Sequence, residues 1–153
     1  MTIPTRRDFC RQVCSATSAL TLGALANACS SPTSPSGSSA PALAILTGTV
    51  ANRTVTVNVV SGSPLDTVGG MALVQTASGN FLAARTGQTT FSVLTATCTH
   101  EACAISGGQS GAFVCPCHGS RFTTSGTVLN GPASVPLRQF TAQFASDVLT
   151  FAI

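Results

Sequence analysis

The chain has 153 residues, of which only 7% are charged, and its formal net charge at neutral pH is +3. This length suits one domain with a hydrophobic core and is short for two. The positive charge is concentrated in the first eleven residues, whereas from residue 30 onward four arginines oppose three acidic residues. The chain has no lysine, and its arginines form no cluster that could neutralise the phosphates of a nucleic acid. Composition therefore excludes a nucleic-acid-binding protein.

The first residues of the chain have the order of an export signal. A pair of arginines, Arg6 and Arg7, precedes an uncharged and moderately apolar stretch from Gln12 to Ala28. A basic head, an apolar middle and a small-residue end are typical of export signals, and the paired arginines resemble the twin-arginine type. An ordinary amphipathic helix is disfavoured because this stretch has no charged face to turn toward water. We predict that residues 1–29 are a signal.

The end of this signal allows three outcomes. Ala28 stands immediately before Cys29, as in a lipoprotein cleavage site at which Cys29 would become the lipidated first residue. Alternatively, ordinary cleavage after Ala28 would release a free protein, or the stretch would stay as an uncleaved anchor, for which it is short. Residues 30–41 are rich in Ser, Pro and Gly, a composition typical of a flexible tether. We expect a location on the periplasmic side of a bacterial membrane, with an anchor of lipid or uncleaved signal.

Residues 42–153 have the pattern of one all-β domain. Alternating, β-branched and aromatic runs predict strands at 54–60, 71–76, 81–85, 91–97, 112–115, 127–129, 136–144 and 147–153. Residues 77–80 have the composition of a hairpin turn. No stretch after residue 40 has a helical period. Short strands at this spacing predict a small antiparallel sandwich or barrel.

Both histidines and four of the seven cysteines lie in two short motifs, CTHEAC at 98–103 and CPCHGS at 115–120. Two cysteines and two histidines are enough ligands for one zinc ion or one two-iron cluster. The two ligands of a Cys-x-His pair are closer in sequence than the paired ligands of most zinc sites, but their side chains can bind two neighbouring metal ions. Each motif would then give one thiolate to one iron and one imidazole to the other, which is a known [2Fe–2S] ligand set. A zinc site and two structural disulfides with bystander histidines are the alternatives.

The two motifs resemble the cluster-binding boxes of the Rieske iron–sulfur family, in the branch found in cytochrome bc-type quinol-oxidising complexes. The resemblance covers roughly Leu73 to Ile153 and implies a cluster-binding subdomain built from two loops. It implies one [2Fe–2S] cluster bound by Cys98, His100, Cys115 and His118. It also implies a disulfide between Cys103 and Cys117, two cysteines that the oxygenase branch lacks. Such a bond persists in the oxidising compartment that an exported protein enters.

The resemblance also implies roles for residues beside the two boxes. Ser120 would donate a hydrogen bond to a ligand sulfur, and Gly131-Pro132 would belong to a loop that covers the cluster. Phe122 stands where the family has a tyrosine donor, which predicts a lower reduction potential than in relatives with tyrosine. Glu101 replaces a leucine that lines the quinol pocket of the family, and Ala102 replaces a glycine.

The implied cluster accepts and releases electrons, and the protein itself would break no bonds. We therefore expect electron transfer as its function. We expect the iron–sulfur subunit of a quinol–cytochrome c reductase-like complex or of a related periplasmic oxidoreductase. Its partners would be proteins of the cytochrome b or c type, the large subunit of a periplasmic oxidase, or a quinol. The alternative is a stand-alone, lipid-tethered electron carrier without a quinol site. A ferredoxin component of an oxygenase is a further alternative, against which the export signal and the two additional cysteines argue.

Overall fold

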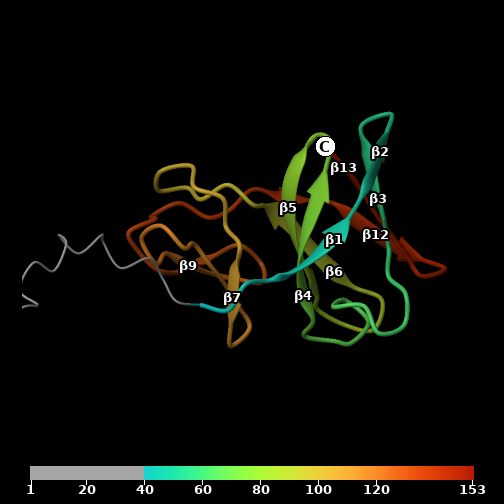
Figure 1. Cartoon of the computed structure of the whole chain (residues 1–153), viewed down its shortest axis with the longest axis horizontal. Helices are drawn as coiled ribbons and strands as arrows, with labels where there is room; N and C mark the ends of the chain where they lie inside the picture. Colours follow the sequence, from blue (N-terminus) through green and yellow to red (C-terminus); the bar gives the residue numbers. More distant parts are fainter. Residues whose placement is uncertain (1–39) are drawn as a thin grey trace, which may run out of the picture. The chain divides into compact units, whose positions relative to one another are not determined.

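The computed structural model describes residues 40–153, and within this part of the chain all regular secondary structure is β. Thirteen short strands form three sheets (Figure 1), which confirms the predicted all-β class. Among the residues described, no helix has the length and apolar character needed to cross a bilayer. The predicted signal with Cys29, and the predicted tether up to residue 39, lie outside the described residues.

The largest sheet has the strand order β1-β4-β5-β6-β11. Its strands span Ala44–Thr47 (β1), Met71–Thr76 (β4), Gly79–Arg85 (β5), Phe91–Thr95 (β6) and Gln139–Phe140 (β11). Strands β4, β5, β6 and β11 are antiparallel to their neighbours, whereas β1 pairs with β4 in parallel. The turn between β4 and β5 lies within the predicted hairpin turn at residues 77–80.

A second sheet, with the order β12-β13-β3-β2, packs against the largest one. Its strands span Ala142–Ala145 (β12), Val148–Ala152 (β13), Thr54–Asn58 (β3) and Thr49–Ala51 (β2). Successive side chains of β3 point to opposite faces of the sheet. Val55 and Val57 are buried, whereas Thr54 on the other face is partly exposed, so one face of β3 packs against the largest sheet. We call these two sheets the base. Their shared core includes the edge-to-face contacts of Phe81 with Phe140 and Phe151.

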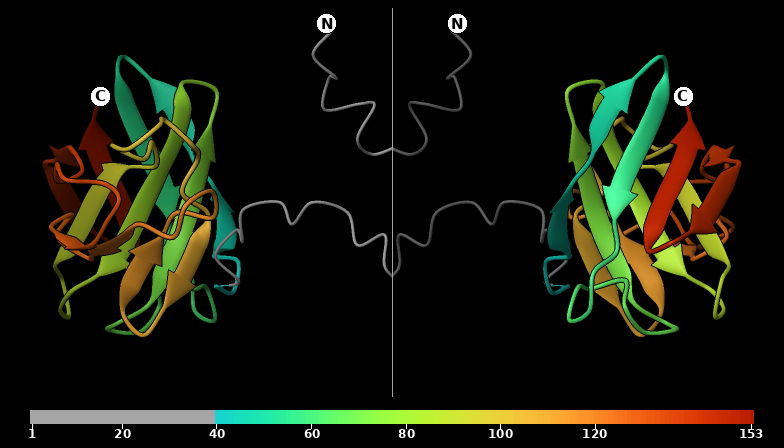
Figure 2. Two further views of the ribbon diagram at one scale, coloured as in Figure 1. Left: turned by 90° about the vertical axis from the view of Figure 1, so that its left-hand side faces the viewer. Right: turned by 90° about the vertical axis from the view of Figure 1, so that its right-hand side faces the viewer.

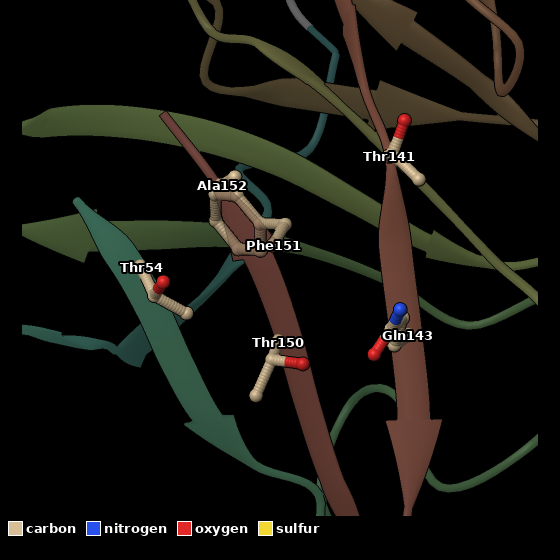
Figure 3. A pocket seen from close by; sticks show the side chains of 6 residues that line it. All are labelled: Thr54, Thr141, Gln143, Thr150, Phe151 and Ala152. Carbon is tan, nitrogen blue, oxygen red and sulfur yellow. The ribbon is translucent and has the colours of Figure 1, made fainter. Parts of the chain in front are cut away.

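The outer face of the second sheet has a hollow that is lined by uncharged side chains. Figure 3 shows this hollow and the six side chains that line it: Thr54, Thr141, Gln143, Thr150, Phe151 and Ala152. The β2–β3 hairpin and the C-terminal strand lie at one end of the base (Figure 2), where Arg53 Nε donates a hydrogen bond to the Ile153 carbonyl oxygen at 3.0 Å. None of the candidate metal ligands lines this hollow.

The third sheet carries the two Cys/His motifs and has the order β10-β9-β8-β7. Its strands span Val128–Asn130 (β10), Arg121–Thr123 (β9), Ala112–Val114 (β8) and Gly107–Gln109 (β7). We call this sheet and its loops the cluster-binding half; it lies on the side of the domain away from the β12–β13 hairpin (Figure 1). Its core contains Phe113 and Phe122, which face each other across β8 and β9.

One extended segment joins the cluster-binding half to the base. The backbone N–H of Gly108 donates to the Pro41 carbonyl oxygen at 2.9 Å, and the N–H of Leu43 donates to the Ser106 carbonyl oxygen at 2.7 Å. Leu43 is buried in the core of the cluster-binding half, and the chain then continues directly into β1 of the base. Glycine at position 108 permits this approach, because a Cβ atom there would lie 2.5 Å from Leu43 Cδ2.

The structure corrects the strand prediction in three respects. The predicted strand at 136–144 is two strands, β11 and β12, which belong to different sheets because the chain crosses from one sheet to the other at Thr141. Four strands were not predicted, namely β1, β2, β7 and β9. The predicted strands at 54–60 and 91–97 also end earlier, at Asn58 and Thr95.

Candidate metal centre

The first Cys/His motif forms a compact loop after β6. A β-bridge between Thr97 and Ala104 closes the loop, and inside it the N–H of Cys98 donates to the Cys103 carbonyl oxygen at 2.8 Å. Ala102 has a φ of 56°, in the left-handed region that costs a residue with a side chain about 1 kcal/mol. This backbone conformation explains why glycine is usual at this position of the family.

The second Cys/His motif forms a tighter loop between β8 and β9. The N–H of Cys115 donates to the Ser120 carbonyl oxygen at 2.9 Å, and the N–H of Gly119 donates back to the Cys115 carbonyl oxygen at 3.0 Å. Gly119 has a φ of 75°, which glycine adopts without strain. These hydrogen bonds fix the direction of Cys115 and of the residues up to Ser120.

A disulfide bond links the two loops. Cys103 and Cys117 are joined by an S–S bond of 2.09 Å, and 14 positions separate them in the sequence. This is the pair that the family resemblance implies. Because each cysteine lies within one loop, the bond holds the two motifs side by side.

The other two cysteines of the motifs, Cys98 and Cys115, are free thiols, and they are only 3% and 1% exposed. Burial raises the pKa of the Cys115 thiol, and its hydrogen-bond contact with Cys98 raises it further. The backbone N–H groups of Cys117 and His118 point at the same sulfur and act in the opposite direction. Two thiolates in contact away from water need a compensating charge, which a bound metal supplies. This pair therefore fits a metal site.

The two histidines lie at the surface of the same loops. The rings of His100 and His118 are perpendicular, with an interplanar angle of 89° and centroids 5.0 Å apart. The carboxylate Oε2 of Glu101 lies 3.8 Å from Nδ1 of His118. All four predicted ligands thus lie on two adjacent loops, with the sulfurs buried and the imidazoles exposed.

A covering segment, residues 131–135, is tied to both loops. Ser120 is fully buried, and its Oγ accepts a hydrogen bond from the N–H of Ala133 at 3.0 Å. The hydroxyl of Thr99 donates to the Val135 carbonyl oxygen at 2.6 Å. Gly131-Pro132, a cis peptide, opens this segment and is exposed. The predicted loop residues therefore lie beside the two motifs.

Phe122 and Arg121 lie on opposite faces of β9. Phe122 is fully buried in the same core as Cys98 and Cys115. Successive side chains of a strand alternate in direction, so Arg121 faces away from that core. Its Nε atom is buried and has no hydrogen-bond partner among residues 40–153.

Two hydrogen bonds of the site, made by Thr99 and Ala133, were not predicted from the sequence. Thr99 and Ala133 hold the covering segment against the loops through one side-chain and one backbone donor. The position of Thr99 between two candidate ligands was the one signal in the sequence that could have indicated a role. A buried backbone N–H such as that of Ala133 leaves no pattern in the sequence.

The fold and this ligand arrangement define an iron–sulfur protein of the Rieske type. The Rieske [2Fe-2S] domain family matches residues 50–141, more than half of the chain, and the protein belongs to this family. The domain binds a [2Fe–2S] cluster and transfers electrons. The cluster is the cofactor that the buried thiol pair and the exposed imidazole pair fit.

Similar proteins include subunits of cytochrome complexes. Over 59 residues the chain is 41% identical to the cytochrome b6-f complex iron-sulfur subunit of Trichodesmium erythraeum and to the mitochondrial Rieske subunit of the cytochrome b-c1 complex of Aotus azarae. These matches span 38% and 37% of this chain, but only 33% and 22% of those relatives. The crystal structure of the plasma membrane Rieske protein PetC3 from Synechocystis PCC 6803 is 30% identical, with a TM-score of 0.51. That match covers 63% of this chain and 98% of the other.

Proposed function

We propose that the cluster is held by Cys98, His100, Cys115 and His118, and that the protein relays single electrons between docked redox partners. The observation that carries this proposal is the pairing of two buried thiols with two exposed imidazoles on loops joined by a disulfide. Thiols at this depth exclude water from one side of the site. Imidazoles at the surface place the other side within reach of a partner.

The bound cluster supplies the capacity to accept and release one electron. The chain's own residues set how readily this happens. Ser120 accepts the Ala133 N–H and keeps its own O–H free to donate, and the Cys117 and His118 N–H groups point at the Cys115 sulfur. Hydrogen bonds to sulfur draw negative charge away and favour the reduced state.

Metal and sulfide analysis of the purified protein tests this assignment. We expect iron and acid-labile sulfide in equal amounts and a Rieske-type EPR signal after reduction. Stoichiometric zinc without sulfide would overturn the proposal. Cys98→Ser and His118→Ala should each remove the EPR signal, whereas Asp66→Asn, at a half-buried acid of the base, should leave it unchanged.

The first candidate context is the iron–sulfur subunit of a quinol–cytochrome c reductase-like complex or of a related periplasmic oxidoreductase. The relatives that are subunits of b6-f and b-c1 complexes support it. A cytochrome of the b or c type, or a large oxidase subunit, would be the partner. Gentle solubilisation of native membranes followed by affinity capture of this chain should recover such a partner in stoichiometric amount.

The second candidate is a stand-alone tethered carrier without a quinol site. The exposed carboxylate of Glu101 beside His118 supports it, because a carboxylate replaces an apolar wall at the point where the imidazoles reach the surface. Recovery of the chain alone from native membranes, with no oxidation of added quinol, would favour this candidate. The disulfide argues against the oxygenase ferredoxin, whose branch lacks these cysteines.

Export through a twin-arginine signal and tethering on the periplasmic side complete the proposal. The sequence order at residues 1–29 supports it. Replacement of Arg6 and Arg7 by lysine should retain the protein in the cytoplasm. Mass spectrometry of the mature N-terminus would distinguish a lipidated Cys29, a free N-terminus after Ala28, and an uncleaved signal.

A further inference from the structure

Exposed side chains of mixed character lie on the two loops that carry the imidazoles and on segments paired or hydrogen-bonded with these loops. We call them the tip surface and define it by five residues: His100, Glu101, His118, Leu129 and Val135. Leu129 and Val135 are large apolar side chains that are 57% and 55% exposed. Val135 lies beside the first motif because its carbonyl oxygen accepts the Thr99 hydroxyl. Leu129 lies in β10, whose partner strand β9 leaves the second motif.

Glu101 gives this surface its charge. Its side chain is 61% exposed and borders His118. The other acidic residues described lie in the base: Asp66 accepts the Gly62 N–H, and Asp147 lies in the exposed turn between β12 and β13. Arg85 bonds to carbonyl oxygens of the base and Arg138 stacks on Phe140, whereas Arg121 lies in β9 of the cluster-binding half with its Nε buried. Glu101 is therefore the exposed charge that borders an imidazole on the tip surface.

We propose that the tip surface docks a redox protein whose exposed cofactor edge is ringed by basic side chains, and that Glu101 sets this preference. The inference rests on the proposed electron relay and names its partner class. Leu129 and Val135 would bury apolar area against the partner, and Glu101 would pair with a lysine or arginine at the rim. One electron leaves the reduced protein and reduces one oxidised partner, and no bond forms or breaks.

A small apolar partner would suit this surface less well. Covering Glu101 with an apolar molecule would remove water from a carboxylate without supplying a cation, which is costly. A basic protein avoids this cost and gains from attraction during the approach. A charge at the rim of an interface acts mainly on the association rate and on its salt dependence.

Stopped-flow oxidation of the reduced holoprotein by a basic, ferric c-type cytochrome tests the proposal. The second-order rate constant should fall as ionic strength rises from about 0.01 M to about 0.15 M, over which the screening length shortens from about 30 Å to about 8 Å. Glu101→Gln should lower the low-salt rate by about threefold and flatten the salt dependence. Glu101→Lys should reverse the sign of the salt dependence.

Asp147→Asn is the matched control, because it removes the same charge from the turn between β12 and β13, a hairpin that lies on the side of the domain away from the cluster-binding half (Figure 1). Asp147 has a φ of 59°, a conformation that asparagine also adopts, so the turn should survive. This variant should keep the wild-type rate and salt dependence. A changed reduction potential would alter the rate at low and at high salt alike, whereas weaker docking would alter mainly the low-salt rate. The ratio of the two rates within each variant therefore reports on docking.

The outcomes separate the two proposals. Each sample is first checked for its cluster by EPR, and a wild-type protein without a cluster would end the proposed function itself. A loaded protein whose rate is independent of salt, or equal in wild type and Glu101→Gln, would overturn the docking inference alone. If Glu101→Gln loses its cluster, wild type is compared with basic and acidic cytochromes. Faster, salt-sensitive reaction with the basic one supports the inference, and the reverse order refutes it.

Discussion

The base and the cluster-binding half are stabilised in different ways. The base has strands of up to seven residues, a core of Val, Leu and Phe, and three Phe rings in mutual contact. The cluster-binding half has strands of three residues and shares an apolar core with the largest sheet, and a disulfide and loop hydrogen bonds additionally hold its functional loops. The comparison teaches that apolar burial stabilises the scaffold, whereas crosslinks and directed donors position the site.

Arg85 shows how the base also uses polar contacts. Its guanidinium donates to the carbonyl oxygens of Leu65 at 3.2 Å and Asp66 at 2.5 Å, and it also bonds to Gln88. Its Cζ lies 5.3 Å from the Phe91 ring centroid. One half-buried cation thus satisfies carbonyl groups in two loops of the base.

The largest expected effect is the loss of one ligand. Cys115→Ser should abolish the cluster, because a hydroxyl replaces the thiolate that the Cys117 and His118 N–H groups are aimed at. We expect the visible absorbance and EPR signal to vanish while amide protons of β4, β5 and β6 stay protected from hydrogen exchange. Protection in β7, β8 and β9 should fall. Equal loss of protection in both halves would show that the base does not fold independently of the cluster.

Removal of the disulfide should weaken the cluster-binding half selectively. The bond spans 14 positions, for which chain-entropy arguments give about 3 kcal/mol of stabilisation. The double variant Cys103→Ala/Cys117→Ala should hold fewer clusters and lose them faster to a chelator. Mass spectrometry of non-reduced digests checks the bond in the parent protein. Free alkylation of both thiols in air-handled holoprotein would contradict the structure.

Loss of the Arg85 contacts should destabilise the base and leave the cluster unaffected. Arg85→Met removes donors from partly buried carbonyl groups, which costs about 1–3 kcal/mol per group left unsatisfied, so we expect a clear drop in the denaturant midpoint. The reduction potential should not change. Arg53→Met is the control, because exposed Arg53 makes one side-chain hydrogen bond, and its loss should cost less than about 0.5 kcal/mol. A shift of potential in Arg85→Met would mean that the two halves are energetically coupled.

The same contrast explains what the sequence could predict about the fold. TVTVN in β3 alternates, and both this run and FSVLT in β6 are rich in β-branched or aromatic residues with their own strand preference, so the base was largely foreseen. Strand β7 has the sequence GGQ, which has no such preference and forms a strand because it lies between β8 and residues 41–43. The parallel β1–β4 pairing likewise depends on distant partners.

The site divides in a similar way. Ligand chemistry restricts residue types and spacing, so the two motifs could be recognised from the sequence alone. The Thr99–Val135 hydrogen bond spans 36 positions and is invisible to any local pattern. The same holds for the position of Glu101 beside His118, since residues of two loops meet there only after the chain has folded.

A smaller effect is expected from Ser120. Its Oγ accepts the Ala133 N–H, so its O–H is the group left to donate to a ligand sulfur. Ser120→Ala should lower the midpoint potential by some tens of millivolts, because the reduced state loses a hydrogen bond. Thr99→Val is the control for loosening of the covering segment, since it removes the bond to Val135 without removing that donor. An unchanged potential in a fully loaded Ser120→Ala protein would exclude Ser120 as a donor.

The last prediction concerns the midpoint potential of Phe122→Tyr, which changes only where the new hydroxyl reaches a ligand sulfur. The ring is fully buried in the same core as Cys98 and Cys115, and it cannot donate a hydrogen bond. In Phe122→Tyr a hydroxyl that reaches a ligand sulfur would stabilise the more negative, reduced state. For a one-electron couple a tenfold change in the equilibrium corresponds to about 59 mV, or about 1.4 kcal/mol. We therefore expect a rise of some tens of millivolts.

The structure makes the Phe122→Tyr comparison interpretable. Arg121 is the charge nearest in sequence, and it faces away from the core that contains Phe122, so the new hydroxyl would lie on the other side of β9 from this cation. Phe113→Tyr is the matched variant, because Phe113 faces Phe122 across β8 and β9 in the same core. A higher potential in Phe122→Tyr but not in Phe113→Tyr would locate the effect at a ligand sulfur. Equal shifts in both variants would trace it to added polarity in the core, and the alignment of Phe122 with the family's tyrosine would then fail.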